Sequence, residues 1–255
     1  MPSDIPQADL SLLLAVFLPP AALDTFGPLV AERTLDTPFG PVGPVGLRAR
    51  SHGPAIWVQP YSGSPVRTDP RAAIHAALQL GARQILAWDA CVSLTPTLQR
   101  GQIAIVSDYI DWTRSLPHTF AGADASLEQI DQTAQRPVIC PRLSAALRRA
   151  MPDAVDVVYL GMDGPRRETA AEARMFAQWG ADVASYNLVP EAALAQEAGL
   201  CYAGLVTVAE IGADRAQPDP HGEVRAALGA ALAALPDFLN EVSPAGECVC
   251  RAPLL

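Results

Sequence analysis

An acidic side chain beside a threonine stands where an apolar run passes through a turn into a helical pattern. The run is "VDVVYLGMD", the turn is Gly164-Pro165, and Glu168 follows two arginines and precedes "TAAEARMFAQW". A strand, a turn and a helix start in this order are typical of a binding loop, where a carboxylate can accept hydrogen bonds from a substrate. The alternative is structural, because the helix dipole by itself favours an acidic residue in the first turn. Glu168 is therefore a candidate for substrate binding or for helix stabilisation.

Cysteines form a second group of chemically capable residues. There are five, without a Cys-x-x-Cys pair, so their number and spacing do not describe a disulfide framework. Cys91, Cys140 and Cys201 lie in apolar contexts that predict small core residues. Cys248 and Cys250 form a Cys-Val-Cys pair that could close a strained disulfide, lend two thiolates to a metal, or belong to an ordinary mobile tail.

The elements that must position these side chains alternate along the chain. Apolar runs predict strands at residues 10–18, 55–61, 82–90, 102–110, 155–162, 181–187 and 201–210. Helical patterns cover residues 70–80, 141–150, 169–179, 190–198 and 223–239. The Pro- and Gly-rich segments 37–46 and 214–222 are interpreted as loops, and residues 1–9 and 244–255 as flexible tails. The alternation predicts one α/β domain over residues 1–255, with a central mixed sheet flanked by helices.

The composition describes a compact globular chain. Of its 255 residues, 50% are hydrophobic and 18% are charged, which is enough apolar material for one large core. The formal net charge is -9 and basic residues do not cluster, which argues against a nucleic-acid partner. The longest apolar stretch, residues 10–23, is interrupted by two prolines, and the residues before it lack the positive charge of a signal peptide. We expect a cytoplasmic protein without a membrane partner.

The segment from Gly164 to Gly204 resembles the trimeric purine nucleoside phosphorylases and the related methylthioadenosine phosphorylases. It shares, in order, the Gly-Pro turn with Glu-Thr-x-Ala-Glu, the Trp-Gly-Ala-Asp-Val strand entry, the Val-Pro-Glu helix start and the Glu-Ala-Gly-x-x-x-Ala turn. Weaker matches are "DTPFG" at 36–40, "ACVSL" at 90–94, "GQIAIVSDYID" at 101–111 and "HGEV" at 221–224. The resemblance implies a phosphorylase/hydrolase-like sheet that is partly barrel-like. It also implies cleavage of the N-glycosidic bond of a purine nucleoside by orthophosphate.

At the base end of the implied site, the resemblance singles out three residues. Glu168 aligns with the glutamate that accepts hydrogen bonds from the purine ring in the 6-oxopurine enzymes, which favours a ring N–H over adenine. Glu210 aligns with the Asn or Asp that faces purine N7, where a carboxyl group with a pKa raised by burial could act as a general acid. A solvated residue at a strand end is the alternative for Glu210. Arg167 replaces the stacking aromatic residue of the family and offers a planar guanidinium.

The sugar contacts and the assembly are also inherited expectations. His221 aligns with the histidine that reaches the 5'-hydroxyl, and Tyr186 replaces the methionine under the ribose. A surface histidine and a core tyrosine are the structural alternatives. The resemblance further implies a homotrimer in which "PHTF" at 117–120 lies near a neighbouring site, with Phe120 reaching across.

The phosphate end departs from the family pattern. The first strand runs into "FLPPAAL", where relatives have a Gly-rich loop with hydroxyl groups, and prolines leave few N–H groups for an anion. Ser62, Asn187 and the Ala90 backbone N–H remain as donors. Asp89 stands where relatives carry Thr or Asn. If ionised and facing the site, it opposes phosphate by about 4 kcal/mol at a separation of about 4 Å. It could instead orient a water molecule, or form an ion pair or cap at a strand end.

Three functions follow from these residues. The main prediction is phosphorolysis of a purine nucleoside or methylthio-nucleoside, with no metal and no organic cofactor. A nucleoside hydrolase that uses water is one alternative, and a catalytically inactive paralogue that binds a purine or nucleoside is the other. The identity of the base and the choice between a 5'-hydroxyl and a 5'-methylthio group stay open.

Overall fold

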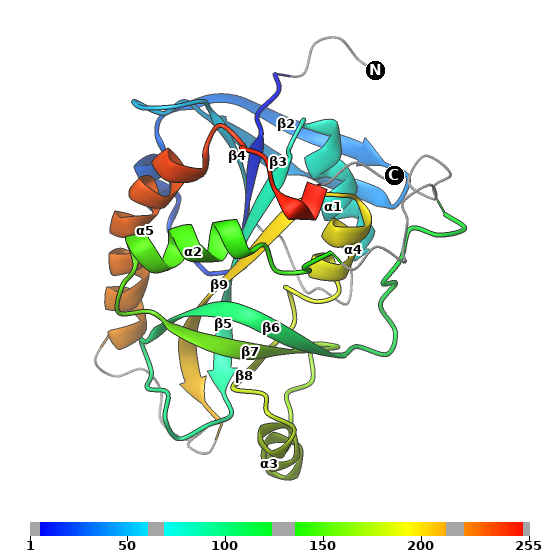
Figure 1. The fold of residues 1–255 in the computed structure, drawn as a ribbon, viewed down its shortest axis with the longest axis vertical. Coiled ribbons are helices and arrows are strands. Elements are labelled where there is room, and N and C mark those ends of the chain that lie inside the picture. The colour runs from blue at the N-terminus through cyan, green and yellow to red at the C-terminus, as the bar shows by residue number, and fades with distance from the viewer. Residues whose placement is uncertain (1–5, 61–68, 124–135, 213–221, 252–255) are drawn as a thin grey trace.

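The computed structural model of the chain describes residues 6–60, 69–123, 136–212 and 222–251 (Figure 1). The strands are β1 (Leu10–Leu14), β2 (Leu29–Thr37), β3 (Gly40–Arg48), β4 (Ile56–Pro60), β5 (Gln84–Ser93), β6 (Ile103–Trp112), β7 (Val155–Met162), β8 (Val183–Ser185) and β9 (Cys201–Ile211). The α-helices are α1 (Pro70–Gln79), α2 (Pro141–Ala150), α3 (Ala170–Gln178), α4 (Glu191–Glu197) and α5 (Glu223–Val242). Two 3-10 helices, η1 (Pro20–Phe26) and η3 (Val249–Arg251), complete the described elements.

The strands of the described chain form one mixed sheet with a closed part and an open part. Their order is β2-β3-β4-β1-β5-β8-β7-β6-β9. Because β5 also pairs with β9, strands β5, β8, β7, β6 and β9 close into a barrel. The open part is joined to the barrel through β1, which pairs in parallel with β5. The predicted α/β class, with a mixed and partly barrel-like sheet, is confirmed.

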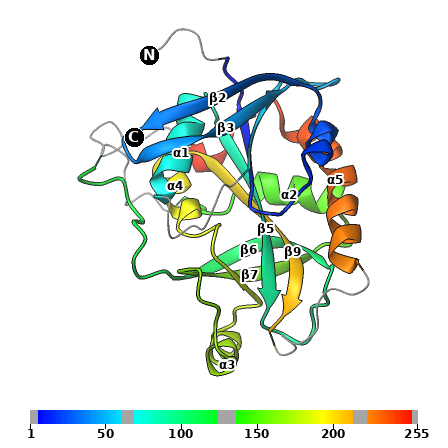
Figure 2. The same ribbon diagram turned by 180° about the vertical axis from the view of Figure 1, so that it is seen from behind.

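Helices pack on both faces of β5, the strand shared by the open and closed parts. Leu86 and Trp88 belong to one core cluster together with side chains of α2 and α5, whereas Ile85 and Ala87 belong to another with α1 and α4. Successive side chains of a strand point to opposite faces, so β5 is covered on both. In contrast, α3 lies apart at the end of the barrel toward which the arrowheads of β5 and β9 point (Figures 1 and 2).

The interpretation of residues 37–46 as a loop is wrong. Most of this Pro- and Gly-rich segment is β3, which pairs with β2 on one side along its length and with β4 only at its last three residues. Proline cannot donate to a neighbouring strand, and is tolerated where one side of a strand is unpaired or at a bulge. Pro41 lies in the half of β3 that β4 does not reach, and Pro44 lies at the register shift opposite Thr34. The sequence pattern alone also missed β2.

The remaining boundaries differ from the predictions mainly at prolines and at the C-terminal end. β1 stops at Leu14 rather than at residue 18, and Pro19 precedes η1. Within the segment 244–251, for which a flexible tail was the expectation, Cys250 is only 2% exposed and Cys248 packs against the core, whereas Val249 is 62% exposed. Of the predicted loop at 214–222, only Gly222 lies within the described residues. Among the described helices, none is both long enough and apolar enough to cross a membrane.

Candidate functional site

Glu168 points into the protein interior and does not cap helix α3. Thr169 is the N-cap residue of α3, and it forms a capping box with Glu172. Glu172 also pairs with Arg166 at 2.8 Å, and this hydrogen bond, together with that from the Thr169 backbone N–H, lowers the pKa of Glu172 to about 2. Glu168 lies just before the cap and is 2% exposed. The helix start is therefore satisfied without Glu168, which is placed for another role.

The residues at the predicted base end gather around the carboxyl end of β9. Arg167 forms an ion pair with Glu210, and that hydrogen bond raises the pKa of Arg167. Burial and the neighbouring Glu168 carboxylate raise the pKa of Tyr186, while Arg167 opposes this rise. A methyl group added at Gly212 would meet the Glu168 Oε1 atom at 3.8 Å and the Val92 Cγ1 atom at 3.6 Å. Glu168, Arg167, Tyr186 and Glu210 thus form one cluster, which we call the base-end cluster.

Glu210 is not in the environment that general-acid catalysis by a buried carboxyl group requires. Its side chain is 42% exposed and paired with the Arg167 guanidinium. Glu210 and Arg167 together therefore present a planar, charge-balanced pair.

Asp89 is buried and accepts hydrogen bonds from neutral groups only, among the described residues. Its oxygens accept from the Tyr159 hydroxyl at 2.8 Å, from Asn187 Nδ2 at 2.9 Å and from the Ala90 backbone N–H at 2.8 Å. Burial raises the pKa of Asp89 from 3.8 to about 6, and these hydrogen bonds limit the rise. The structural alternatives were an ion pair or a cap at a strand end, but Asp89 lies inside β5 and its described donors are neutral.

Tyr159 completes this network and was not identified from the sequence. Its hydroxyl donates to Asp89 and accepts from the backbone N–H groups of Asn187 and Leu188, at 3.2 and 3.4 Å. Ser185 Oγ donates to the Ala90 carbonyl at 2.9 Å. Asn187 and Asp89, which the resemblance assigned to the phosphate end, are thus hydrogen-bonded to each other. A tyrosine in the apolar run of β7 gives no signal in the sequence that it will meet these residues.

A cavity of about 790 Å³ lies between the barrel, the segment after β1 and helix α5; we call it the α5 cavity. Its wall is formed by Val16, Phe17, Leu18, Pro19, Ala22, Ala90, Thr207, Ala209, Val224, Arg225, Leu228, Gly229 and Leu232. The proline-rich segment after β1 forms one wall and leaves the cavity open. Asp89 does not line this cavity, because it points to the opposite face of β5 from Ala90. Of the described lining residues, Arg225 is the charged one.

A second cavity, of about 910 Å³, lies between the loop after β5, the carboxyl end of β9 and helix α3. Ser93, Ile211 and Gly212 line this α3 cavity, together with Arg174. Glu168 lies close to Gly212, so the base-end cluster adjoins the α3 cavity at the carboxyl ends of β5 and β9, although its four residues do not line either cavity. Ligands of parallel α/β sheets bind beyond such strand ends.

The structure does not bring every predicted site residue to this region. Phe120 is fully buried and packs edge-on against Phe39. Its backbone N–H donates a hydrogen bond to the Glu197 carboxylate. The expectation that Phe120 reaches a neighbouring subunit is therefore wrong, because its side chain belongs to the core of its own chain. Ser62 and His221 lie outside the described residues.

Comparisons with known proteins identify the family of the chain. The sequence profile of the phosphorylase superfamily matches residues 22–243. The purine nucleoside phosphorylase of Drosophila melanogaster is 35% identical over 189 residues, which are 69% of this chain and 65% of that protein, slightly under two thirds of its length. The probable 6-oxopurine nucleoside phosphorylase of Moorella thermoacetica is 33% identical over 208 residues, or 76% of this chain and 78% of that protein.

Solved structures share the fold over nearly the whole chain. A methylthioadenosine phosphorylase from an antarctic soil metagenomic library superimposes with a TM-score of 0.81 at 22% identity, covering 96% of this chain and 90% of that one. The methylthioadenosine phosphorylase of Schistosoma mansoni in complex with tubercidin gives a TM-score of 0.74 at 22% identity. The class of protein is an α/β protein with the fold of these solved phosphorylases. This chain belongs to the phosphorylase superfamily.

Proposed function

We propose that the protein cleaves the N-glycosidic bond of a purine nucleoside or methylthio-nucleoside with orthophosphate as the nucleophile. The observation that carries the proposal is the buried Glu168 at the carboxyl ends of β5 and β9, separate from the capping of α3. Its neighbours Tyr186 and the Arg167–Glu210 pair give this position the polar groups and planar surfaces that a heterocycle needs.

The base is proposed to lie against the base-end cluster, with the sugar extending toward the α5 cavity. Glu168 would accept a hydrogen bond from a ring N–H, which favours 6-oxopurines. The Arg167 guanidinium would stack on the base, as its planar shape allows. Tyr186 would contact the ribose. We place His221 at the 5' end of the sugar, on the resemblance alone.

The leaving base gains negative charge as the glycosidic bond breaks, and a donor near N7 stabilises that charge. In this proposal the Arg167 guanidinium, stacked on the base and paired with Glu210, supplies positive charge near the leaving base in place of an in-plane donor. Holding the base and the sugar in one orientation further lowers the activation barrier, because a positioned nucleophile avoids the entropy cost of a bimolecular encounter.

The described wall of the α5 cavity is mostly apolar, so it offers few groups that could bind an anionic co-substrate. Arg225 brings a positive charge to it, and the Ala90 backbone lies on its wall. Ser62 stays a proposed donor, whereas the side chain of Asn187 is already bonded to Asp89. Asp89 is proposed to position Asn187 and Tyr159 and not to activate water, because it lines neither large cavity.

A homotrimer, a cytoplasmic location and the absence of an organic cofactor belong to this proposal through family membership. Exposed apolar side chains support an assembly: Phe17, Leu29 and Val30 are 91%, 49% and 56% exposed. Large exposed apolar groups that gather on one face mark interaction surfaces.

The decisive experiment incubates the purified protein with inosine, guanosine, adenosine and 5'-methylthio-nucleosides, with and without orthophosphate, and follows the free base. The proposal expects base release that depends on phosphate and is fastest with a 6-oxopurine. Release at the same rate in phosphate-free buffer would establish a hydrolase instead. No release, combined with thermal stabilisation by a purine, would leave a binding protein.

A further inference from the structure

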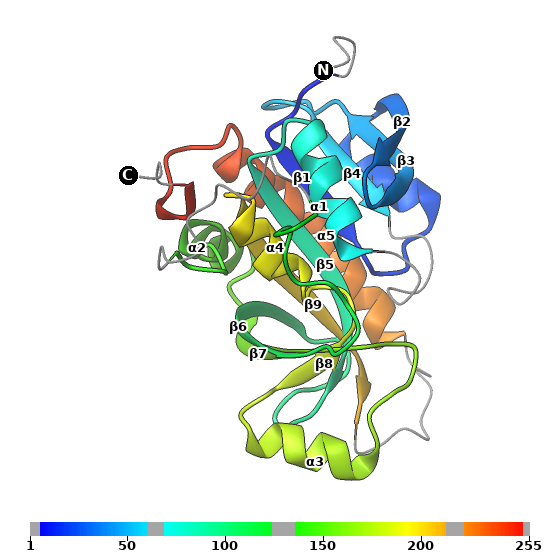
Figure 3. The ribbon, with the colours of Figure 1, turned by 90° about the vertical axis from the view of Figure 1, so that its right-hand side faces the viewer.

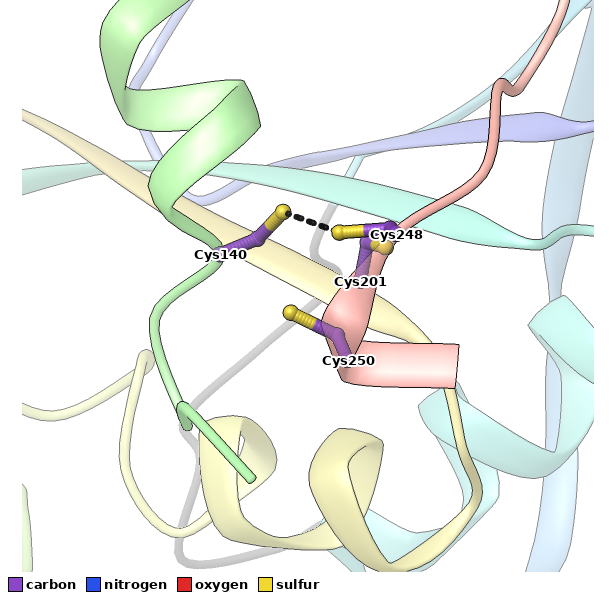
Figure 4. Close-up of side chains that lie close together, drawn as sticks. All are labelled: Cys140, Cys201, Cys248 and Cys250. Carbon is purple, nitrogen blue, oxygen red and sulfur yellow. Dashed lines mark hydrogen bonds between the residues drawn. The ribbon is translucent and has the colours of Figure 1, made fainter. Parts of the chain in front are cut away.

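Four cysteines that are far apart in the sequence converge at one point of the fold. Cys140, Cys201, Cys248 and Cys250 place their Sγ atoms within 4.8 Å of one another (Figure 4). Cys140 is the N-cap residue of α2, Cys201 begins β9, Cys250 lies in η3 and Cys248 directly precedes η3. All five cysteines of the chain lie in its described part, and the fifth, Cys91, is buried elsewhere.

Two of these cysteines are fixed by the backbone of the core. Cys140 is the N-cap residue of α2, and its N–H donates to the Tyr202 carbonyl at 2.7 Å. The N–H of Cys201, the first residue of β9, donates to the Arg83 carbonyl at 3.1 Å. Both side chains are fully buried. This half of the cluster is therefore preformed by the junction of α2 and β9.

The other two cysteines arrive on the C-terminal segment, which is anchored next to the N-terminal strand. Ser243 Oγ donates to Asp9 Oδ1 at 3.0 Å, and the Ala245 N–H donates to the other oxygen of the same carboxylate. The chain then turns through η3, so that the Cys-Val-Cys pair faces Cys140 and Cys201 (Figure 4). Val249 between them is 62% exposed, so the pair points inward while its spacer points outward.

The spacing of the sulfur atoms fits a tetrahedral metal centre. A Zn–S distance of about 2.3 Å places the four sulfurs of a tetrahedron about 3.8 Å apart. The Sγ atoms of Cys140 and Cys248 are 3.4 Å apart, much longer than the roughly 2.05 Å of a disulfide bond. The structure contains no disulfide among these cysteines. Four protein ligands leave no open position, which is the pattern of a structural and not a catalytic site.

We propose that Cys140, Cys201, Cys248 and Cys250 form a structural tetrathiolate site for a soft divalent cation, Zn²⁺ by its ligand preference. Binding replaces the four thiol protons by four Zn–S bonds and releases these protons, with no change of oxidation state. The metal attaches the C-terminal segment to α2 and β9. None of the four cysteines lines either large cavity, so this site does not depend on the proposed function.

Metal content and a spectroscopic probe test the site on the full chain. The protein is purified under reducing conditions, dialysed against metal-depleted buffer, and measured by plasma mass spectrometry. We expect about one Zn²⁺ per chain. Replacement by Co²⁺ should give the intense visible bands and the sulfur-to-cobalt charge-transfer absorption of a tetrahedral thiolate site, and Zn²⁺ should abolish them.

Substitutions show whether these four thiols are the ligands. Cys248→Ser and Cys250→Ser should each lower the Zn²⁺ affinity at least tenfold, whereas the control Cys91→Ser should keep one Zn²⁺ per chain. Chelation should lower the melting temperature of the wild type and not that of Cys248→Ser. If a variant does not fold, the Co²⁺ spectrum of the wild type still decides. A wild-type chain without metal overturns the proposal, whether its intact mass shows four thiols or two disulfides.

Discussion

Glu168 and Glu172 lie four residues apart and have opposite environments. Glu172 is bound to Arg166 and to the N-cap backbone, so its charge stabilises the start of α3. Glu168 is buried beside Tyr186 and Arg167. Burying a carboxylate costs free energy unless hydrogen bonds or charged partners compensate. The sequence alone does not show which of the two glutamates stabilises the start of α3. The burial of Glu168 in the structure distinguishes them.

Glu168→Gln should therefore reduce kcat/KM for 6-oxopurine nucleosides by about 10- to 150-fold. The loss corresponds to about 1.5–3 kcal/mol for a hydrogen bond that involves a charged group. The matched control is Glu172→Gln, which keeps a side chain suited to a capping box. Steady-state kinetics should show nearly unchanged kcat/KM for the control. Equal losses in both variants would contradict the assignment of Glu168 to the base.

Asp89 makes the stability of the protein depend on pH in a predictable direction. Its pKa rises from 3.8 to about 6 on folding, so the folded state holds the proton more tightly. This contribution to stability is complete below pH 3.8 and is lost as the pH rises through 6. Two pKa units correspond to about 3 kcal/mol.

The side chain of Asp89→Asn cannot titrate, so the variant should not lose this contribution to stability as the pH rises. Between pH 4 and pH 8, the free energy of unfolding of the wild type should fall relative to that of the variant by up to about 3 kcal/mol. Urea denaturation at the two pH values measures this difference. Phosphate-dependent base release should persist in Asp89→Asn, because we assign Asp89 a positioning role. A parallel pH dependence of the two proteins would refute the raised pKa.

At the scale of elements, the site depends on how closely β7 packs against the segment that follows β8. Gly161 of β7 pairs with Ser185 of β8. A Cβ atom at Gly161 would overlap the Cβ atom of Val189, whose branched side chain has little freedom to move. The same segment carries Tyr186 and Asn187, so this glycine helps to set the position of both.

Gly161→Ala should lower the free energy of unfolding by about 1–3 kcal/mol through overpacking. Gly229→Ala serves as the opposite control, because a Cβ atom there meets nothing within 4 Å and the residue lies inside α5. An alanine in place of glycine in an exposed helix should stabilise by about 1 kcal/mol. Guanidinium denaturation measures both effects. A neutral Gly161→Ala would mean that β7 and the Val189 segment separate easily.

At the scale of the whole molecule, the proposed trimer requires that exposed apolar surface be covered. Phe17 is 91% exposed and lies on the wall of the α5 cavity, whereas Trp179 is 49% exposed at the end of α3. Trp179 follows α3, which lies at the end of the barrel away from β2 and β3 (Figure 3), whereas Phe17 follows β1. We propose the subunit interface at Phe17, following the expectation from the resemblance that each site lies near a neighbouring subunit.

Light scattering at micromolar concentration should therefore give about three times the chain mass of 26.9 kDa. Phe17→Ser should shift the trimer toward smaller species, and Trp179→Ser should leave it intact, because only the first removes apolar area from the interface. A monomeric wild type would contradict the trimer. Dissociation by Trp179→Ser alone would move the interface to α3.

The sequence by itself determined the elements and the family. Apolar runs and helix-start prolines predicted β7, β9 and α2 close to their observed bounds, because hydrophobic periodicity and local backbone preferences act over a few residues. The order of the motifs from Gly164 to Gly204 indicated a nucleoside-cleaving phosphorylase. The strand β3 was missed because its prolines are acceptable only where the neighbouring strand is absent or at a bulge. The strand β2 contains no proline and was missed because its mostly exposed residues form no apolar run.

Tertiary structure alone decided which side chains meet. Asp89 lies with Tyr159 and Asn187, Arg167 pairs with Glu210, and Phe120 turns into the core. The four clustered cysteines come from segments that share no local pattern. Spacing along the chain fixes contacts only within one element, whereas closure of the barrel and docking of the C-terminal segment bring distant residues together. The hydrogen-bond partners and the burial of each site residue depend on those long-range contacts.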